Sequence, residues 1–122
     1  MANILFVDDE PLTRKLLLQA ATILGHQGIS ASTPEEAMQM AAEHLPDLIV
    51  TDVNLEGRQS LEMIEQLKQS EVTKHIPIVT LSALDLVEIQ EQARARGAVD
   101  SLEKPIRLQT LLEVIRKYAP ED

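Results

Sequence analysis

Three acids fall at the ends of short apolar runs, where carboxylates are well placed to do chemistry. Asp8 and Asp9 follow the run 4–7, and Asp52 follows the run 48–51. Short apolar runs of this kind are typical of buried parallel strands, and ligands of open α/β sheets bind at the carboxyl ends of the strands. If the two strands are neighbours, three carboxylates meet at one edge. Two unit charges about 4 Å apart repel by about 4 kcal/mol at an effective dielectric of about 20, so the pattern favours a bound cation or a nearby ammonium.

The Asp8-Asp9 pair has two interpretations, and both stay open. Hard divalent cations such as Mg²⁺ prefer carboxylate oxygens and commonly bind one or two carboxylates together with water and phosphate. An Asp just before Pro11 also suits the N-cap of a helix, where it complements the helix dipole. The two roles are compatible, one for each Asp.

Asp52 and Ser82 also have a chemical and a structural interpretation. A carboxylate at a strand end can attack phosphorus and form an acyl phosphate, whereas a single Asp is more commonly a solvated loop acid. Ser82 follows the apolar run 78–81, where its hydroxyl can donate to a phosphoryl oxygen. Viewed alone, Ser82 is more commonly the cap of a helix that starts near Asp85.

Lys104 precedes Pro105 after a fifth short run, 99–102. An ammonium at the same edge would offset the acids and bind a phosphoryl group as a point charge. The alternative is a surface Lys before a Pro that starts a helix. Only X-Pro bonds adopt cis at low cost, and a cis bond here would aim the Lys inward. The candidate groups follow the first, third, fourth and fifth strands at one edge, and chance rarely supplies such a set.

The elements that must position these groups alternate five times between strand and helix. Strands are expected at 3–7, 28–32, 47–51, 76–81 and 99–102. Helices are expected at 11–25, from Thr33 onward, and at 58–70, 85–96 and 106–118. Strict β-α alternation predicts a parallel sheet covered on both faces through right-handed crossovers.

Composition narrows the class of protein. A chain of 122 residues predicts one domain over 1–122, and its single Phe, single Tyr and absent Trp predict an aliphatic core. The net charge of −9 opposes direct binding to nucleic acid. The absence of cysteine excludes disulfides, thiolate metal sites and thiol catalysis. With no signal-like N-terminus and no apolar run near the ~18–20 residues that span a bilayer, we expect a cytoplasmic protein without membrane contact.

Over essentially its whole length the sequence resembles the receiver domain of two-component response regulators. The resemblance rests on Asp8-Asp9-Glu10, Asp52, Ser82-Ala83 and Lys104-Pro105 within five β-α units. It implies a doubly wound, flavodoxin-like (βα)5 three-layer sandwich, with a five-stranded parallel sheet of strand order 2-1-3-4-5.

The resemblance also implies a set of roles. Asp52 would accept a phosphoryl group from a phosphohistidine on a sensor histidine kinase or a histidine phosphotransfer protein, and Ser82 and Lys104 would contact that group. The chain would assist transfer to and from Asp52 while acting mainly as a signalling domain, and homodimerisation on phosphorylation is a further expectation. The cofactor would be Mg²⁺, for which Mn²⁺ is expected to substitute, and the implied ligands are Asp8, Asp9, Asp52 and the main-chain carbonyl of Asn54.

The loop after Asp52 departs from the family pattern. Receivers usually carry a Pro and then a Gly ahead of the third helix. Here Glu56 and Ser60 stand in those places, with Gly57 between them. The shape of this loop and its extra negative charge beside the metal site are therefore not fixed by the resemblance.

Two further departures concern signalling. Ser101 stands where the fifth strand usually carries a Tyr or Phe, and Leu84, two residues after Ser82, is bulky and apolar. In the family that aromatic swings inward as the hydroxyl residue moves toward phosphate. We therefore expect a smaller conformational change than in a typical receiver, driven by the loop 82–86 through Leu84 and Leu86 and with little change at Ser101.

Alternatives from other classes fit less well. A phosphatase of the haloacid dehalogenase type needs a second acid two residues after its nucleophile, where this chain has Asn54. A flavodoxin-like electron carrier needs a hydroxyl- or Gly-rich phosphate loop, and a P-loop NTPase needs a Gly-x-x-x-x-Gly-Lys motif that is absent. The remaining alternative is a degenerate receiver that acts as a phosphorylation-independent binding module, which Ser101 and the altered loop favour.

The helix expected over 11–25 is more apolar than one inward stripe requires. Leu17, Ala21 and Leu24 fit the core stripe, whereas Leu18 is expected to face outward. An exposed apolar residue near the active edge suits helix-on-helix docking of a kinase.

Overall fold

The computed structural model describes residues 1–55, 58–83 and 87–119, and it contains the expected five-stranded sheet. Neighbouring strands are all parallel and lie in the spatial order β2-β1-β3-β6-β7. This is the predicted order 2-1-3-4-5, because β4 and β5 form a separate small sheet. The main strands are β1 (Asn3–Val7), β2 (Gln27–Ala31), β3 (Leu48–Asp52), β6 (Ile78–Ser82) and β7 (Asp100–Glu103).

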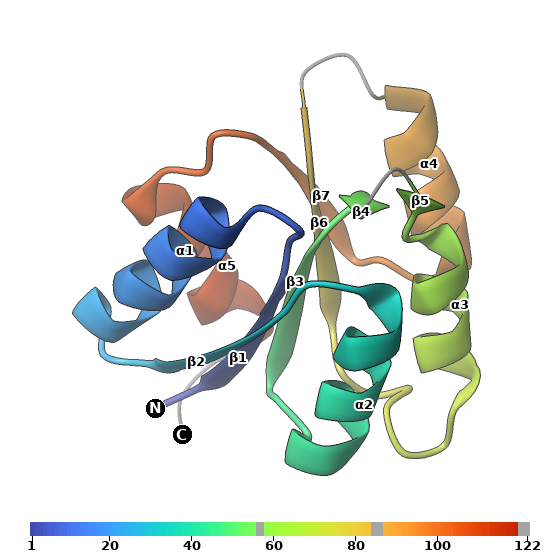
Figure 1. The fold of residues 1–122 in the computed structure, drawn as a ribbon, viewed down its shortest axis with the longest axis horizontal. Coiled ribbons are helices and arrows are strands. Elements are labelled where there is room, and N and C mark those ends of the chain that lie inside the picture. The colour runs from blue at the N-terminus through green and yellow to red at the C-terminus, as the bar shows by residue number, and fades with distance from the viewer. Residues whose placement is uncertain (56–57, 84–86, 120–122) are drawn as a thin grey trace.

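In the described part of the chain, five helices cover the two faces of this sheet. In Figure 1, α1 and α5 lie on one face, and α2, α3 and α4 lie on the other. The fold is thus the predicted doubly wound three-layer sandwich. The helices are α1 (Pro11–Ile23), α2 (Pro34–His44), α3 (Leu61–Gln69), α4 (Val87–Arg96) and α5 (Leu108–Tyr118).

Each face of the sheet has its own apolar cluster, because side chains alternate between faces along a strand. Phe6, Val50 and Leu81 pack toward α1 and α5. Leu5 and Ile49, which belong to the same strands as Phe6 and Val50, pack toward α2, α3 and α4. Burial on both faces explains why β1, β3 and β6 appear in the sequence as apolar runs.

The main departure from the predicted elements follows β3. The helix predicted over 58–70 begins only at Leu61, because the preceding segment forms a short antiparallel hairpin. Its strands are β4 (Asn54–Leu55) and β5 (Arg58–Gln59). This hairpin lies beside the carboxyl end of β3, in the segment after Asp52 whose sequence departs from the family pattern.

Other boundaries differ from the prediction by one or two residues. The helix predicted over 106–118 begins at Leu108, because Arg107 has an extended backbone with φ −92° and ψ 151°. The helix predicted over 85–96 is described from residue 87 onward. No helix among residues 1–55, 58–83 and 87–119 is long and apolar enough to cross a membrane. The expectations for Glu56, Gly57, Leu84, Asp85 and Leu86 lie outside the described residues.

Candidate functional site

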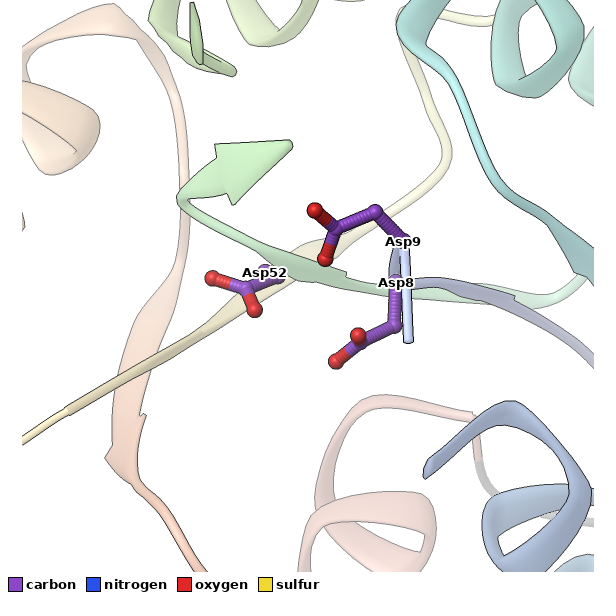
Figure 2. A group of neighbouring side chains, drawn as sticks. All are labelled: Asp8, Asp9 and Asp52. Atoms are coloured by element: carbon purple, nitrogen blue, oxygen red, sulfur yellow. The ribbon is translucent and has the colours of Figure 1, made fainter. Parts of the chain in front are cut away.

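The acids after β1 and at the end of β3 meet because these two strands are neighbours. Val7 pairs with Thr51, so Asp8 and Asp52, one residue further along each strand, stand side by side at the carboxyl edge. One carboxylate oxygen from each of Asp8, Asp9 and Asp52 lies within 4.8 Å of the others. Figure 2 shows the three side chains converging on one space. Three carboxylates so arranged offer a hard divalent cation the oxygen ligands that it prefers.

Burial differs among the three acids. Asp8 is fully buried and Asp52 is 8% exposed, whereas Asp9 is exposed. The main-chain nitrogen of Asp8 donates to the Ala31 carbonyl at 3.1 Å, and its own carbonyl accepts from Nη1 of Arg14 at 2.8 Å. Asp8 is therefore rigidly held, while Asp9 stands at the open side of the cluster.

Lys104 bridges two of these acids from the loop after β7. Its Nζ lies 2.7 Å from Oδ2 of Asp8 and 2.5 Å from Oδ2 of Asp52. The Lys104–Pro105 peptide bond is cis, as the sequence suggested. The ammonium thus pairs with two of the three clustered carboxylates, and the convergent carboxylate oxygens suit a hard divalent cation.

Burial and the ammonium act in opposite directions on the Asp52 carboxyl. Burial raises the pKa of Asp52 above its usual value, although hydrogen bonds from Lys104 and the Asn54 amide oppose this shift. Burial alone would lower the pKa of Lys104, but hydrogen bonds to Asp52 and Asp8 outweigh it and raise that pKa. The ammonium therefore stays charged at neutral pH, and Asp52 is a more basic carboxylate than a solvated Asp.

The two interpretations of the Asp8-Asp9 pair are now distinguished by geometry. The N-cap of α1 is Glu10, whose Oε1 accepts from the Leu12 amide at 3.1 Å. Asp8 instead accepts the Glu10 amide through Oδ1 at 2.9 Å. Neither Asp8 nor Asp9 is the cap residue of the helix, so their carboxylates belong to the cluster.

Ser82 ends β6, as expected, but its partner was not foreseen. Its Oγ accepts a hydrogen bond at 2.6 Å from Nε2 of Gln90, which lies on α4. Ser82 is buried at 1% exposure. Asn54 lies exposed in β4, and its main-chain N–H donates to Oδ1 of Asp52 at 2.9 Å. The contact between Ser82 and Gln90 spans eight residues, a spacing that carries no signal in the sequence.

Ser60 has a defined place behind Asp52. Its Oγ donates to the main-chain carbonyl of Asp52 at 2.8 Å, and its amide donates to the Val53 carbonyl at 2.8 Å. The Thr51 hydroxyl donates to the same Asp52 carbonyl at 2.9 Å. The fully buried Ser60 therefore ties the start of α3 to the end of β3. The signal available in the sequence was a hydroxyl residue at the position where receivers usually have Gly.

Ser101 is held in place on β7. Its Oγ accepts from Oγ1 of Thr80 at 3.0 Å, across the pair of strands β6 and β7. Thr80 is fully buried and Ser101 is half-buried. The position that carries a mobile aromatic in the resembled family is here a small polar residue bonded to the neighbouring strand.

The expectation that Leu18 faces outward is wrong. Leu18 is half-buried against the cluster under α1 and α5, and its Cδ2 lies 2.8 Å from where a Cβ on Gly28 would stand. The missing side chain at Gly28 makes room for Leu18. Leu17 and Ala21 are buried as predicted, and Leu24 packs against the same cluster. The apolar residues that α1 does expose are Leu12, Leu16 and Ile23, at 60%, 55% and 71%.

An open groove of about 450 Å³ runs between α1 and the segment that joins β7 to α5. Lys104 lines it beside the acid cluster, so the groove adjoins the candidate site. The apolar residues that line it include Leu16, Ala20, Ile106 and Leu108.

Comparison with known proteins agrees with this geometry. Residues 4–116 match the response regulator receiver domain family. The polar-differentiation response regulator DivK of Brucella ovis is 31% identical over 116 residues, which cover 95% of this chain and 94% of DivK.

Solved structures show the same fold. A putative response regulator from Chloroflexus aurantiacus superposes with a TM-score of 0.89 at 28% identity, covering 96% of both chains. The chemotaxis protein CheY4 of Vibrio cholerae gives 0.89 at 27% identity, covering 97% of this chain and 98% of CheY4. The family match over nearly the whole chain, with the acids and the Lys in place at one sheet edge, shows that the chain belongs to the response regulator receiver domains.

Proposed function

We propose that Asp52 accepts a phosphoryl group from a phosphohistidine on a sensor histidine kinase or a histidine phosphotransfer protein. The observation that carries this proposal is the convergence of Asp8, Asp9 and Asp52 within 4.8 Å, with Lys104 bridging Asp8 and Asp52. Phosphoryl transfer depends on positioning and charge neutralisation more than on covalent machinery, and this edge supplies both.

In the proposed reaction, a carboxylate oxygen of Asp52 attacks the phosphorus. The new O–P bond forms as the P–N bond to the donor histidine breaks, and the freed ring nitrogen takes a proton from solvent. Lys104 turns from its carboxylate partners to a phosphoryl oxygen, and Ser82 donates its hydroxyl to another. The backbone of Asp52 stays fixed meanwhile through Thr51 and Ser60.

We propose Asp8, Asp9, Asp52 and the main-chain carbonyl of Asn54 as the residues that hold Mg²⁺, or Mn²⁺ in its place. When bound, the cation supplies positive charge to the transferring phosphoryl group. The fit rests on three convergent carboxylates, which each offer one oxygen within 4.8 Å of the others. The receiver domain of the sensor histidine kinase PA1611 of Pseudomonas aeruginosa, which shares this fold at a TM-score of 0.87 and 22% identity, has a magnesium ion coordinated in its active-site cleft.

The test is labelling by a small phosphodonor. The protein is incubated with acetyl phosphate or phosphoramidate, with and without Mg²⁺, and its intact mass is measured. We expect a gain of one phosphoryl group that needs Mg²⁺ and is lost in Asp52→Asn and in Asp9→Ala. Asp47→Asn is the matched control, because Asp47 immediately precedes the first residue of β3 and is therefore at the opposite end of the strand from Asp52. An unchanged wild-type mass, or equal labelling of Asp52→Asn, would instead favour a phosphorylation-independent binding module.

We further propose that the donor protein docks a helix on α1 and the adjoining groove. Leu12 and Leu16 are exposed near the end of α1 that faces the acids, and Leu16 lines the groove together with Lys104. An amphipathic helix that lays its apolar face there would bring a phosphohistidine beside Lys104, and hence beside Asp52.

Substitution of exposed residues on one helix tests this docking. Leu16→Ser is expected to slow transfer from a phosphorylated histidine phosphotransfer protein about tenfold or more, while labelling by acetyl phosphate stays unchanged. Ile23→Ser is the control, because Ile23 is also exposed but lies about 10 Å along the helix from Leu16. Equal effects of the two substitutions would contradict the proposed surface. Homodimerisation on phosphorylation stays a prediction, which light scattering of the labelled protein would check.

A further inference from the structure

The Ser82 hydroxyl and the carboxylates of Asp8 and Asp52 lie at one edge of the sheet but toward opposite faces. Leu48 and Val50, which alternate with Ile49 along β3, pack toward α1 and α5, and the same period places Asp52 on that side. Ile78 packs toward α2, α3 and α4, so the same period places Ser82 on the opposite side. In this structure Ser82 is therefore turned away from the acid that would carry the phosphoryl group.

Gln90 holds the Ser82 hydroxyl on this far side. Its Nε2 donates to Oγ of Ser82 at 2.6 Å. The Ser82 carbonyl accepts from the Lys104 amide at 2.8 Å, and Ser82 pairs with Glu103 in the sheet. Because the ladder fixes the backbone, the hydroxyl reaches a phosphoryl group on Asp52 only by rotating about χ1 to another staggered position. That rotation separates Oγ from Gln90.

The hydrogen bond between Gln90 and Ser82 is important for the stability of α4, because the described side chains of this helix form only a small apolar face. Ala93 is its one buried residue among the side chains described for this helix, and Ile89 is half-buried. Most helical stability in a protein comes from the packing of an apolar face. A helix with so small an apolar face is more sensitive to the loss of a single polar anchor.

The usual aromatic link between the hydroxyl residue and the surface is missing. Ser101 stands in its place and is bonded to Thr80 within the sheet. Among the described residues, the contact that joins the Ser82 side chain to another element is the one with Gln90. A conformational response needs a contact that differs between the two states, and this hydrogen bond is such a contact.

We propose that Gln90 is a positioning residue that holds the Ser82 hydroxyl away from Asp52 in the unphosphorylated protein, and that phosphorylation breaks this hydrogen bond and loosens α4. The inference rests on the proposed phosphorylation of Asp52. Gln90 thus competes with the phosphoryl group for Ser82, so its loss strengthens binding of the phosphoryl group and leaves α4 already loosened.

Beryllofluoride with Mg²⁺, a stable stand-in for the phosphoryl group on Asp52, provides the test. Its affinity is measured by fluorine NMR titration for the wild type, Gln90→Leu and Gln90→Met, each with Ser82 intact and with Ser82→Ala. We expect both Gln90 variants to bind about two- to tenfold more tightly, the range for one net hydrogen bond. In the Ser82→Ala background this gain should disappear.

Amide exchange over residues 87–96 is the second readout. In the wild type we expect faster exchange when beryllofluoride binds, whereas Gln90→Leu should exchange faster from the outset and change little on binding. Gln92→Leu is the matched control, because Gln92 is an exposed Gln on the same helix. Unchanged or weaker affinity of the Gln90 variants, an equal gain in Gln92→Leu, or the same gain with Ser82→Ala would each overturn the proposal. Failure of the wild type to bind beryllofluoride would overturn the proposed function, and this inference with it.

Discussion

Replacing Lys104 by Met removes the ammonium that bridges Asp8 and Asp52, at 2.7 Å and 2.5 Å. At an effective dielectric of about 20, Coulomb's law gives about 6 kcal/mol for each pair, but desolvation offsets most of this. Removing one partner of a buried ion pair costs about 3–5 kcal/mol. The Lys104 side chain is 29% exposed, and Asp52 can bind a proton, so we expect a loss of about 2–3 kcal/mol in the free energy of unfolding at neutral pH.

The loss caused by Lys104→Met should depend on pH. Burial already raises the pKa of Asp52, and without the ammonium this pKa rises further. A carboxyl whose folded-state pKa exceeds its unfolded value binds protons more tightly when folded. The folded state therefore gains stability as the pH falls through that raised pKa. The difference between variant and wild type should be largest near pH 7 and shrink toward about pH 4.

Mg²⁺ should also reduce the loss, because a cation among the three carboxylates replaces the missing ammonium. Urea unfolding followed by far-UV circular dichroism suits a chain without Trp, and Lys15→Met, at an exposed position of α1, is the matched control. A loss no larger than that of Lys15→Met, or one that is independent of both pH and Mg²⁺, would refute the assigned role of the ammonium.

Three further substitutions test neighbouring contacts by the same unfolding assay. Asp52→Asn should stabilise the metal-free protein at pH 7 and lose this advantage below about pH 4, since burial disfavours the ionised acid; destabilisation at pH 7 would contradict this. Ser60→Ala should cost about 1 kcal/mol, because the Asp52 carbonyl loses the hydrogen bond from the Ser60 hydroxyl. The variant should also weaken Mg²⁺ binding, and an effect on neither stability nor Mg²⁺ binding would show that Ser60 positions nothing. Ser101→Ala should cost about 1 kcal/mol or less in the free energy of unfolding, because it loses the contact with Thr80. It should leave the affinity for beryllofluoride unchanged, and a severalfold change in that affinity would show that Ser101 takes part in the switch.

The fold could be predicted because strand-like and helix-like segments alternate along the whole sequence. Apolar runs closed by polar residues predicted β1, β3 and β6, and the alternation of strands with helices supplied β2 and β7. The rule that ligands gather at carboxyl strand ends placed Asp8, Asp52 and Lys104 together. The pairing of Val7 with Thr51 then brings the acids into contact. Strand order came from the family resemblance, and the structure confirms it.

Local packing could not be predicted in the same way. The hairpin of β4 and β5 lies in a segment without a period-2 apolar pattern, so a helix was expected to begin at residue 58 instead of at Leu61. Leu18 was expected to face outward from a count of apolar residues on one helix. Its position depends on Gly28, a strand glycine that leaves room for it. A glycine within a strand was the available signal for close approach.

Alternation of side chains along the strands gives the site an unexpected property, which is that Ser82 is turned away from Asp8 and Asp52. Asp8 and Asp52 follow residues that alternate toward α1 and α5, whereas Ser82 follows residues that alternate toward α4. The sequence places all three at one edge, but the period of two turns the Ser82 hydroxyl toward the face opposite to the carboxylates of Asp8 and Asp52. A phosphoryl group on Asp52 can therefore engage Ser82 only through a rotation that disturbs Gln90. Coupling between the site and α4 thus arises from strand geometry itself, without an aromatic at Ser101.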